Sequence, residues 1–229
     1  MIGERNRRFR IGLYAVILIF LVMMIIIVLH KHDLKRLEIV RRSIPYPERN
    51  IILTKIVHII SRAASISGTK PFLIYGSLLG YIRNKDFICY DFDVDMGVLS
   101  CDYDSLHNAI VGIIGEYPGF TIKYLSFMGK RKFIIYHPAT KLNGDIYEFI
   151  KTKKGYKRNA SDLYSKYILH ERQLRYPFDW IDNLQLVFFK DVPIYIPNQS
   201  DKLLSAYYGD DFIEPDHVCN AECNECKKI

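Results

Sequence analysis

The spacing of apolar residues changes along the chain, and each change predicts a structural element. Residues 11–29 form an unbroken apolar run that includes Gly and one Tyr but no charge. Between residues 48 and 68, apolar residues recur at steps of three and four, the spacing of an amphipathic helix. Residues 91–98 alternate along the chain, which is typical of a strand with one buried face. The chain from residue 48 onward therefore predicts an α+β domain.

Shorter patterns predict the remaining elements of this domain. Apolar runs bounded by turn residues predict strands, and a return of the helical spacing predicts helices. The further strands expected are 71–75, 120–127, 131–137, 145–150 and 192–196. The further helices expected are a short turn that opens at Gly76, a helix over 103–117, another over 161–169, and a last one that Ser200 caps and Gly209 ends. This order of elements predicts a mixed sheet flanked by helices.

The apolar run at 11–29 is long enough to cross a membrane. About 20 residues, each rising about 1.5 Å, span a hydrocarbon core of about 30 Å as a helix. A cleaved signal peptide is the alternative, but its apolar region is about 7–15 residues long, and no small-residue cleavage site follows this run. We therefore predict one uncleaved transmembrane helix before the domain. The expected division is a basic tail (1–10), the anchor (11–29), a stem (30–47), a catalytic domain (48–213) and a Cys-rich tail (214–229).

Most of the net charge of +7 lies around the predicted anchor. Residues 1–42 contain nine Lys and Arg against three acidic residues, which leaves +1 for the rest of the chain. Basic residues beside an anchor contact anionic lipid headgroups, and the body lacks the basic excess of a nucleic-acid-binding protein. The charge is nearly balanced across the anchor, so it does not decide the orientation. Two sequons, at Asn159 and Asn198, can accept glycans if the domain is lumenal.

Acidic residues on the strand at 91–98 carry the candidate chemistry. Because side chains alternate along a strand, Asp91, Asp93 and Asp95 share one face, while Phe92 and Val94 point into the core. Three carboxylates on one face repel each other unless a cation neutralises them. Hard oxygen ligands at this spacing suit Mg²⁺ or Mn²⁺. A solvated strand end or a calcium-loop-like set of ligands is the alternative interpretation.

A Gly-Ser turn precedes this strand and supplies features of a phosphate site. Gly76 lets the backbone approach a phosphate closely, and the helix that follows offers free N–H groups at its positive end. Ser77 adds a hydroxyl donor, and the guanidinium of Arg83 can pair with phosphate oxygens. An ordinary turn explains Gly76 and Ser77 equally well when they are taken alone. The turn and the aspartates together are a more specific signal than either feature.

Two segments resemble the signature of the LicD/fukutin family. Residues 76–83 read Gly-Ser-Leu-Leu-Gly-x-x-Arg, and residues 88–95 read Ile-x-x-Asp-x-Asp-Val-Asp. The family pattern is Gly-Thr/Ser-Leu-Leu-Gly-x-x-Arg followed at the same distance by Ile-Pro-Trp-Asp-Asp-Asp-Ile-Asp. Residues 192–211 also resemble the closing block of the family, so the resemblance covers roughly 48–213. This chain has Cys-Tyr in place of Pro-Trp, and Phe92 in place of an Asp.

The resemblance implies a nucleotidyltransferase fold and a phosphotransferase. Such an enzyme transfers a phosphate-linked alcohol or sugar, similar to phosphocholine or ribitol phosphate, from a nucleotide donor to a glycan or glycoprotein acceptor. A CDP-linked donor is the first expectation. Family members with this layout usually place the domain in the lumen, which implies a type II membrane protein of the Golgi or endoplasmic reticulum.

The resemblance also assigns site residues. A third carboxylate comes from residues 144–148, which resemble an Asp-hydrophobic-aromatic element of the family, although an Asp in a turn at the start of a strand is the alternative. Glu148 has the opposite strand parity and is expected to face away. The implied donor-binding residues are Gly76, Ser77 and Arg83, the implied metal ligands are Asp91, Asp93, Asp95 and Asp145, and the implied catalytic residues are Asp93, Asp95 and Asp145.

Two other functions fit parts of the sequence. Asp91 to Asp95 contain two overlapping Asp-x-Asp triplets, which membrane-anchored glycosyltransferases use to hold Mn²⁺ and a nucleotide sugar. Those enzymes do not require the Gly-Ser turn at this distance. A membrane-tethered scaffold with a degenerate site is the third possibility, but all three same-face aspartates are present.

The C-terminal tail is rich in soft ligands. His217, Cys219, Cys223 and Cys226 lie within ten residues. A zinc site is one interpretation, although zinc ligands usually come from two separated segments. Disulfides, with Cys89 or Cys101 as additional partners, are favoured by a lumenal compartment. An unstructured tail is the third interpretation, and the sequence leaves all three open.

Overall fold

The computed structural model describes residues 18, 20–25, 32, 35–127, 130–159, 175–215, 217–220, 223 and 226–228. The chain forms two compact units, 1–43 and 44–229. In the first unit, residues 20–25 and 35–42 are helical. Among the described residues, no helix has both the length and the apolar content that a membrane crossing requires. The anchor predicted at 11–29 lies largely outside those residues.

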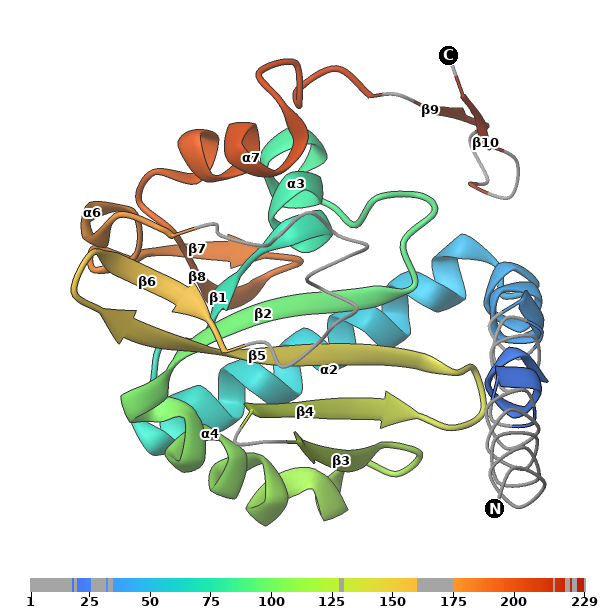
Figure 1. Cartoon of the computed structure of the whole chain (residues 1–229), viewed down its shortest axis with the longest axis horizontal. Coiled ribbons are helices and arrows are strands. Elements are labelled where there is room, and N and C mark those ends of the chain that lie inside the picture. The colour runs from blue at the N-terminus through green and yellow to red at the C-terminus, as the bar shows by residue number, and fades with distance from the viewer. Residues whose placement is uncertain are drawn as a thin grey trace, which may run out of the picture. The chain divides into compact units, whose positions relative to one another are not determined.

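The second unit is built on an eight-stranded mixed sheet (Figure 1). The strands run in the order β3-β4-β5-β2-β1-β8-β7, and β6 also pairs with β5. The β2–β5 and β1–β8 pairs are parallel, and the other pairs are antiparallel. The bounds are β1 Phe72–Leu73, β2 Asp93–Leu99, β3 Thr121–Phe127, β4 Lys130–His137, β5 Leu142–Thr152, β6 Gly155–Arg158, β7 Gln185–Phe189 and β8 Val192–Ile196.

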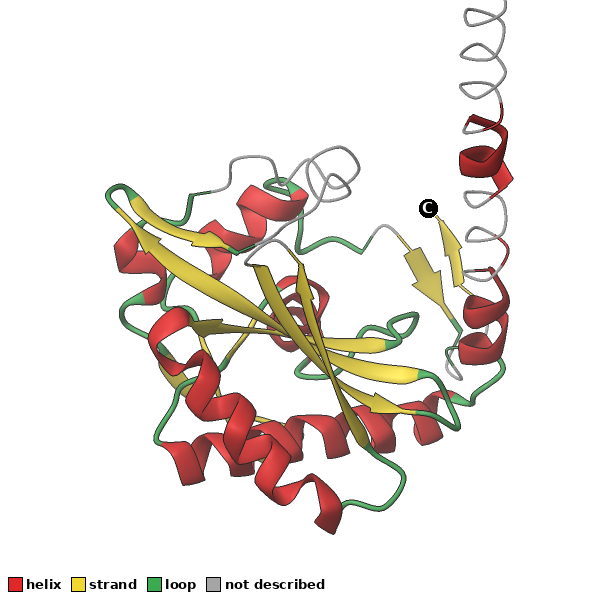
Figure 2. Cartoon of the chain, turned by 60° about the horizontal axis from the view of Figure 1, so that its bottom comes forward, coloured by secondary structure: helices red, strands yellow, loops and turns green. Residues whose placement is uncertain are grey.

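Helices cover both faces of this sheet (Figure 2). One face carries α2 (Tyr46–Ser67) and α4 (Ser100–Ile113), which contact each other and also β2 and β5. The other face carries α3 (Tyr75–Asn84), α6 (Phe178–Ile181) and α7 (Ser200–Tyr208). A 3-10 turn, Ile114–Glu116, follows α4. The predicted α+β architecture, with a mixed sheet flanked by helices, is confirmed.

The long helix α2 is the element that the apolar spacing predicted best. Its buried stripe includes Ile52, Ile56, Ile60 and Ala63, all at the predicted steps. Gly144 on β5 lets α2 approach closely, because a Cβ at this position would collide with Ile56. The helix ends before Gly68, whose φ of 68° is left-handed and favours glycine over other residues.

Several elements differ from those expected. The strands β6 and β7 and the short helix α6 were not predicted, and the helix expected at 161–169 lies outside the described residues. The strand expected at 71–75 is shorter because Tyr75 already belongs to α3. The predicted capping role of Ser200 is wrong. The N-cap of α7 is Gln199, and the buried hydroxyl of Ser200 donates to the carbonyl oxygen of Pro197 at 2.6 Å.

Disulfides organise the C-terminal tail. Cys219 pairs with Cys226 across a small hairpin of β9 (His217–Cys219) and β10 (Cys226–Lys228), and Cys223 pairs with Cys89. Cys101 is an exposed free thiol. No His/Cys group with metal-ligand spacing occurs in the described part of the chain. Of the three interpretations of the tail, the structure therefore adopts the disulfides.

Candidate active site

Three aspartates meet on the face of the sheet opposite α2 and α4. The strands β2 and β5 lie side by side (Figure 1). Their parallel register sets Asp93 opposite Asn143 and Asp95 opposite Asp145. Ligand oxygens of Asp93, Asp95 and Asp145 all lie within 4.8 Å of one another. Asp145 lies within β5 and is not in a turn. The sheet thus brings together the three residues that the family resemblance assigned to catalysis.

The electrostatics of this group favour a cation. Burial raises the pKa of Asp95 well above its usual range, and the negative charges of Asp93 and Asp145 raise it further. Burial and close negative charge are unfavourable for ionised carboxylates unless a cation neutralises them. An all-carboxylate donor set of this size fits a hard divalent ion such as Mg²⁺ or Mn²⁺.

Asp145 is held in one orientation by three donors. The amide of Asn143 donates to Oδ1 at 3.0 Å, and the phenol of Tyr147 donates to Oδ2 at 3.1 Å. The ammonium of Lys132, on the neighbouring strand β4, lies 2.5 Å from Oδ2. Burial and the charge of Asp145 raise the pKa of Tyr147 well above its usual range, so the phenol keeps its proton and remains a donor. Such oriented ligands favour a well-defined metal site.

Asp91 lies just before β2, outside the close group of three. Burial raises its pKa to about 7, the charge of Asp93 adds to this effect, and the charge of Arg49 opposes it. Its carboxylate also occupies the space beside Gly76, because a Cβ on Gly76 would lie 2.8 Å from Oδ2 of Asp91. A residue larger than glycine at position 76 would therefore require the Asp91 carboxylate to move.

Arg49 is a part of this region that the sequence analysis missed. It is only 3% exposed, although it lies on α2 among apolar residues. Its guanidinium donates to the carbonyl oxygen of Cys89 at 2.6 Å and stacks over Phe92, 5.0 Å from the ring centroid. Phe92, which was expected to point into the core, is only half-buried, whereas Val94 is fully buried as expected. The sequence signal that could have identified Arg49 is its position as a charged residue next to the apolar stripe of α2.

The start of α3 connects the Gly-Ser turn to the aspartates. Ser77 is buried, and its hydroxyl oxygen accepts a hydrogen bond from the backbone N–H of Asp95 at 2.9 Å. Tyr75 begins the helix with a φ of 48°, a left-handed conformation that is strained for an aromatic residue. This conformation places its ring against Tyr147 and Tyr207, at centroid distances of 5.8 and 4.6 Å. Strain of this kind often accompanies functional sites.

Arg83 lies at the other end of α3 and binds backbone. Its guanidinium donates to the carbonyl oxygens of Phe212 and Glu214, from Nε to Phe212 at 2.7 Å and from one terminal nitrogen to Glu214 at 2.9 Å. These bonds hold the segment that follows α7. The phosphate-binding role predicted for Arg83 stays a prediction.

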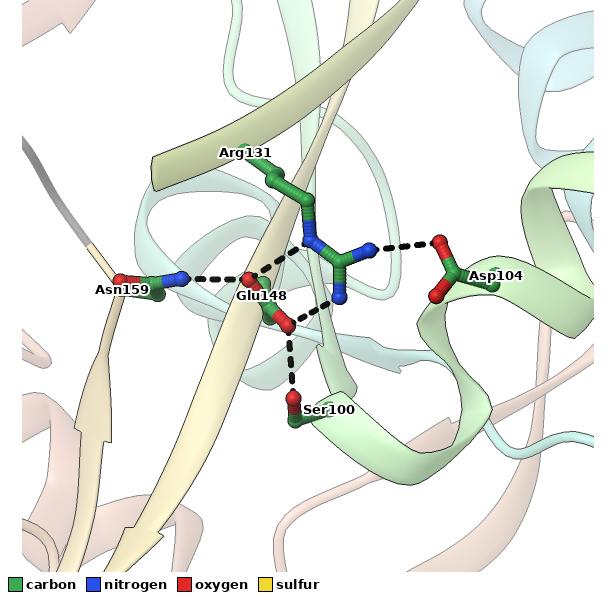
Figure 3. Close-up of polar contacts among 5 residues, drawn as sticks. All are labelled: Ser100, Asp104, Arg131, Glu148 and Asn159. Atoms are coloured by element: carbon green, nitrogen blue, oxygen red, sulfur yellow. Dashed lines mark hydrogen bonds and ion pairs between the residues drawn. The ribbon is translucent and has the colours of Figure 1, made fainter. Parts of the chain in front are cut away.

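Glu148 lies on the opposite face of β5, as its parity predicted. It is buried and accepts hydrogen bonds from Ser100 at 2.6 Å, from two nitrogens of Arg131 at 2.6 and 3.3 Å, and from Asn159 at 2.5 Å (Figure 3). Arg131 also pairs with Asp104. Burial alone would raise the pKa of Glu148, but the hydrogen bonds from Arg131, Ser100 and Asn159 and the charge of Arg131 hold it below its usual range.

Comparisons with known proteins agree with this geometry. Residues 68–199 match the family model described as LicD/FKTN/FKRP, nucleotidyltransferase domain. The human and mouse proteins named ribitol 5-phosphate transferase FKRP are each 26% identical over 151 residues, which is 65% of this chain and 29% of each relative. The chain thus spans less than a third of the length of these curated relatives.

Among solved structures, a crystal structure of ANT(2")-Ia in complex with adenylyl-2"-tobramycin aligns with a TM-score of 0.41 at 13% identity. That alignment covers 72% of this chain and 79% of the other. The family match covers more than half of the chain and includes the Gly-Ser turn and the three clustered aspartates. The chain therefore belongs to the LicD/FKTN/FKRP family of nucleotidyltransferase domains.

Proposed function

We propose that this chain is a divalent-metal-dependent phosphotransferase that moves a phosphate-linked alcohol or sugar from a nucleotide donor to a glycan acceptor. The observation that carries the proposal is the convergence of Asp93, Asp95 and Asp145 within 4.8 Å on one face of the sheet. Family membership supports the same reaction class. The mammalian relatives are named as ribitol 5-phosphate transferases, so a CDP-linked ribitol phosphate donor is the first candidate.

The residues of the site have different proposed roles, which follow from their positions. Asp93, Asp95 and Asp145 would hold the metal, which neutralises developing charge on transferred phosphate groups when it is bound. Asn143, Lys132 and Tyr147 orient the Asp145 carboxylate from three directions. The first turn of α3 presents backbone N–H groups beside Asp95, and helix N-termini are favourable places for phosphate.

We also propose that the domain works in the lumen of the secretory pathway, as a single-pass type II membrane protein. The apolar run at 11–29 supports an anchor. The disulfides Cys89–Cys223 and Cys219–Cys226 support an oxidising compartment, because disulfides persist there and are rare in the cytosol. Protease treatment of sealed microsomes tests this proposal: protection of the domain is expected, and its complete digestion would contradict a lumenal location.

Product analysis tests the reaction class. The purified full chain is incubated with CDP-ribitol, CDP-choline or nucleotide sugars, a panel of glycan acceptors, and Mg²⁺ or Mn²⁺, and products are identified by mass. A phosphotransferase leaves a phosphate in the product and releases a nucleoside monophosphate. A glycosyltransferase adds a sugar without phosphate and releases a nucleoside diphosphate. Metal-dependent transfer with a retained phosphate is expected, and transfer of sugar alone would contradict the proposal.

A further inference from the structure

Two strand ends meet beside residues 147–148 of β5. On one side, β2 pairs with β5 as far as Phe149. The other side is shared: β4 begins near Lys132, which pairs with Tyr147, and β6 ends at Arg158, which pairs with Phe149. The start of β4 and the end of β6 therefore lie next to each other along the same edge of β5.

Glu148 joins these two strand ends on the face that α2 and α4 cover. Arg131 from β4 and Asn159, which follows β6, both donate to its carboxylate (Figure 3). The backbone N–H of Asn159 also donates to the carbonyl oxygen of Glu148 at 2.7 Å. Because Glu148 is only 2% exposed, these bonds are shielded from water and hold both strand ends in register.

The next residues of the same strand ends place two cations on the opposite face, with the aspartates. Lys132 follows Arg131, and Arg158 precedes Asn159, so strand alternation turns both toward the carboxylate face. The Nζ atom of Lys132 and the Cζ atom of Arg158 lie 4.9 and 4.8 Å from the centroid of the Tyr147 ring. Arg158 also lies 5.8 Å from the ring of Tyr75, and Lys132 contacts Asp145.

We propose that Lys132 and Arg158 form a binding site for a phosphoryl group beside the metal-binding aspartates. This inference rests on the proposed function, because a metal that neutralises the aspartates removes the negative charge that would otherwise repel an anion from the two cations. A guanidinium offers two parallel donors that match phosphate oxygens, and an ammonium adds a compact charge. The aromatic faces of Tyr75 and Tyr147 keep the Arg158 guanidinium in place. The phosphoryl group comes either from the donor nucleotide or from a phosphate on the acceptor, and both share this chemistry.

Calorimetric binding to the full chain distinguishes these two sources. The first titration uses CDP in the presence of Mg²⁺, and the second uses inorganic phosphate after the site is saturated with CDP and Mg²⁺. Arg158→Gln is the main variant, because Lys132 also contacts Asp145 and its replacement would disturb two sites. Lys157→Gln is the matched control, since Lys157 is an exposed cation on the other face of β6.

Arg158→Gln is expected to weaken one of the two probes about tenfold or more, with no change in Lys157→Gln. Weaker CDP binding assigns the site to the donor, and weaker phosphate binding assigns it to the acceptor. Arg158→Lys keeps the charge and is expected to lose less affinity, which preserves the test if Arg158→Gln unfolds. Unchanged binding of both probes in both Arg158 variants would overturn the inference. The proposed function would stand in that case if Asp93→Asn still abolished metal-dependent CDP binding.

Discussion

At the residue scale, neighbouring carboxylates differ because their surroundings differ. Ligand oxygens of Asp93, Asp95 and Asp145 lie within 4.8 Å of one another, an arrangement that a divalent cation can neutralise. Glu148 lies three residues after Asp145 on the same strand. Both of its carboxylate oxygens already accept hydrogen bonds from Ser100, Arg131 and Asn159, so they are not available to bind a metal. Asp91 is intermediate, since it is buried near Arg49 but outside the close group. Strand parity correctly predicted that Glu148 faces away from the three aspartates, because parity depends only on local backbone geometry.

Asp91 makes the stability of the metal-free domain depend on pH. Its pKa in the fold is about 7, against about 3.9 in an unfolded chain. The folded chain therefore binds a proton at Asp91 more tightly than the unfolded chain does. This contribution to the stability of the fold is complete below about pH 4 and is lost as the pH rises toward 7. Asp91→Asn should gain stability relative to the natural chain as the pH rises over this window, by roughly 3–4 kcal/mol, because the two pKa values differ by about 3 units and each unit corresponds to about 1.36 kcal/mol. Denaturant unfolding in EDTA at pH 4.5 and pH 8 measures this difference, and a difference independent of pH would contradict the assignment.

Glu148→Gln should keep transfer activity but lower stability. The parity of Glu148 leaves the catalytic face intact, whereas the new amide group would point a donor at Arg131, Ser100 or Asn159. A mismatched buried polar group costs about 1–3 kcal/mol. Thermal unfolding measures this loss, with Glu116→Gln as the control, because Glu116 is an exposed partner of Arg62 whose replacement should cost little. Equal stability of the two variants would show that the Glu148 cluster is not structural.

At the element scale, local patterns predicted the helices and strands that have one apolar face. The bounds of α2, β2 and β8 follow the sequence closely, because burial on one side imposes a regular spacing. The edge strand β7 was missed because most of its side chains are exposed and no alternation appears. The alignment of β5 beside β2 also lies beyond local patterns, since it depends on a crossover through α4, β3 and β4. Asp145 was therefore found through the family resemblance, and Lys132, Arg158 and Arg49 were not found.

The surroundings of the two sequons, at Asn159 and Asn198, predict that only one of them carries a glycan. Nδ2 of Asn159 donates to buried Glu148, and a glycan on that nitrogen would break this bond. Asn198 follows β8 and its side chain is exposed. In a lumenal domain, the folded protein should carry a glycan at Asn198 and none at Asn159. Treatment with a glycosidase should lower the mass of the natural chain and of Asn159→Gln, but not the mass of Asn198→Gln. The reverse pattern would contradict the position of Asn159.

At the scale of the whole molecule, the C-terminal tail is joined to the loop that leads into the candidate active site. Cys223 is bonded to Cys89, two residues before Asp91, and Arg83 holds the carbonyls of Phe212 and Glu214. The family pattern has Pro at the position of Cys89, so this chain replaces a rigid residue with a covalent cross-link. The sequence indicated disulfides as one option but could not choose the pairs, because pairing depends on the position of the tail.

The two disulfides should differ in their contribution to stability. The Cys89–Cys223 bond closes a separation of 134 residues, whereas Cys219–Cys226 closes only seven. Because cross-links over longer loops restrict the unfolded chain more, Cys89→Ser with Cys223→Ser should cost about 2–4 kcal/mol, and Cys219→Ser with Cys226→Ser clearly less. Chemical denaturation of the two double variants provides the comparison. A larger loss for the short hairpin would contradict this account of the tail.

The central claim is that clustered aspartates bind a metal and through it the donor nucleotide. Calorimetric titration of CDP, with and without Mg²⁺, tests this claim most directly on the natural chain and on Asp93→Asn, Asp95→Asn, Asp145→Asn and Glu148→Gln. Metal-dependent binding is expected in the natural chain and in Glu148→Gln, and each Asp variant should lose it. Asp93→Asn and Asp95→Asn should keep their thermal stability, because they relieve repulsion around the buried carboxylate of Asp95. Asp145→Asn also removes the ion pair with Lys132, so some loss of stability is expected there. Loss of a metal ligand should also slow transfer about a thousandfold. Metal-dependent CDP binding that survives in all three Asp variants would contradict the account.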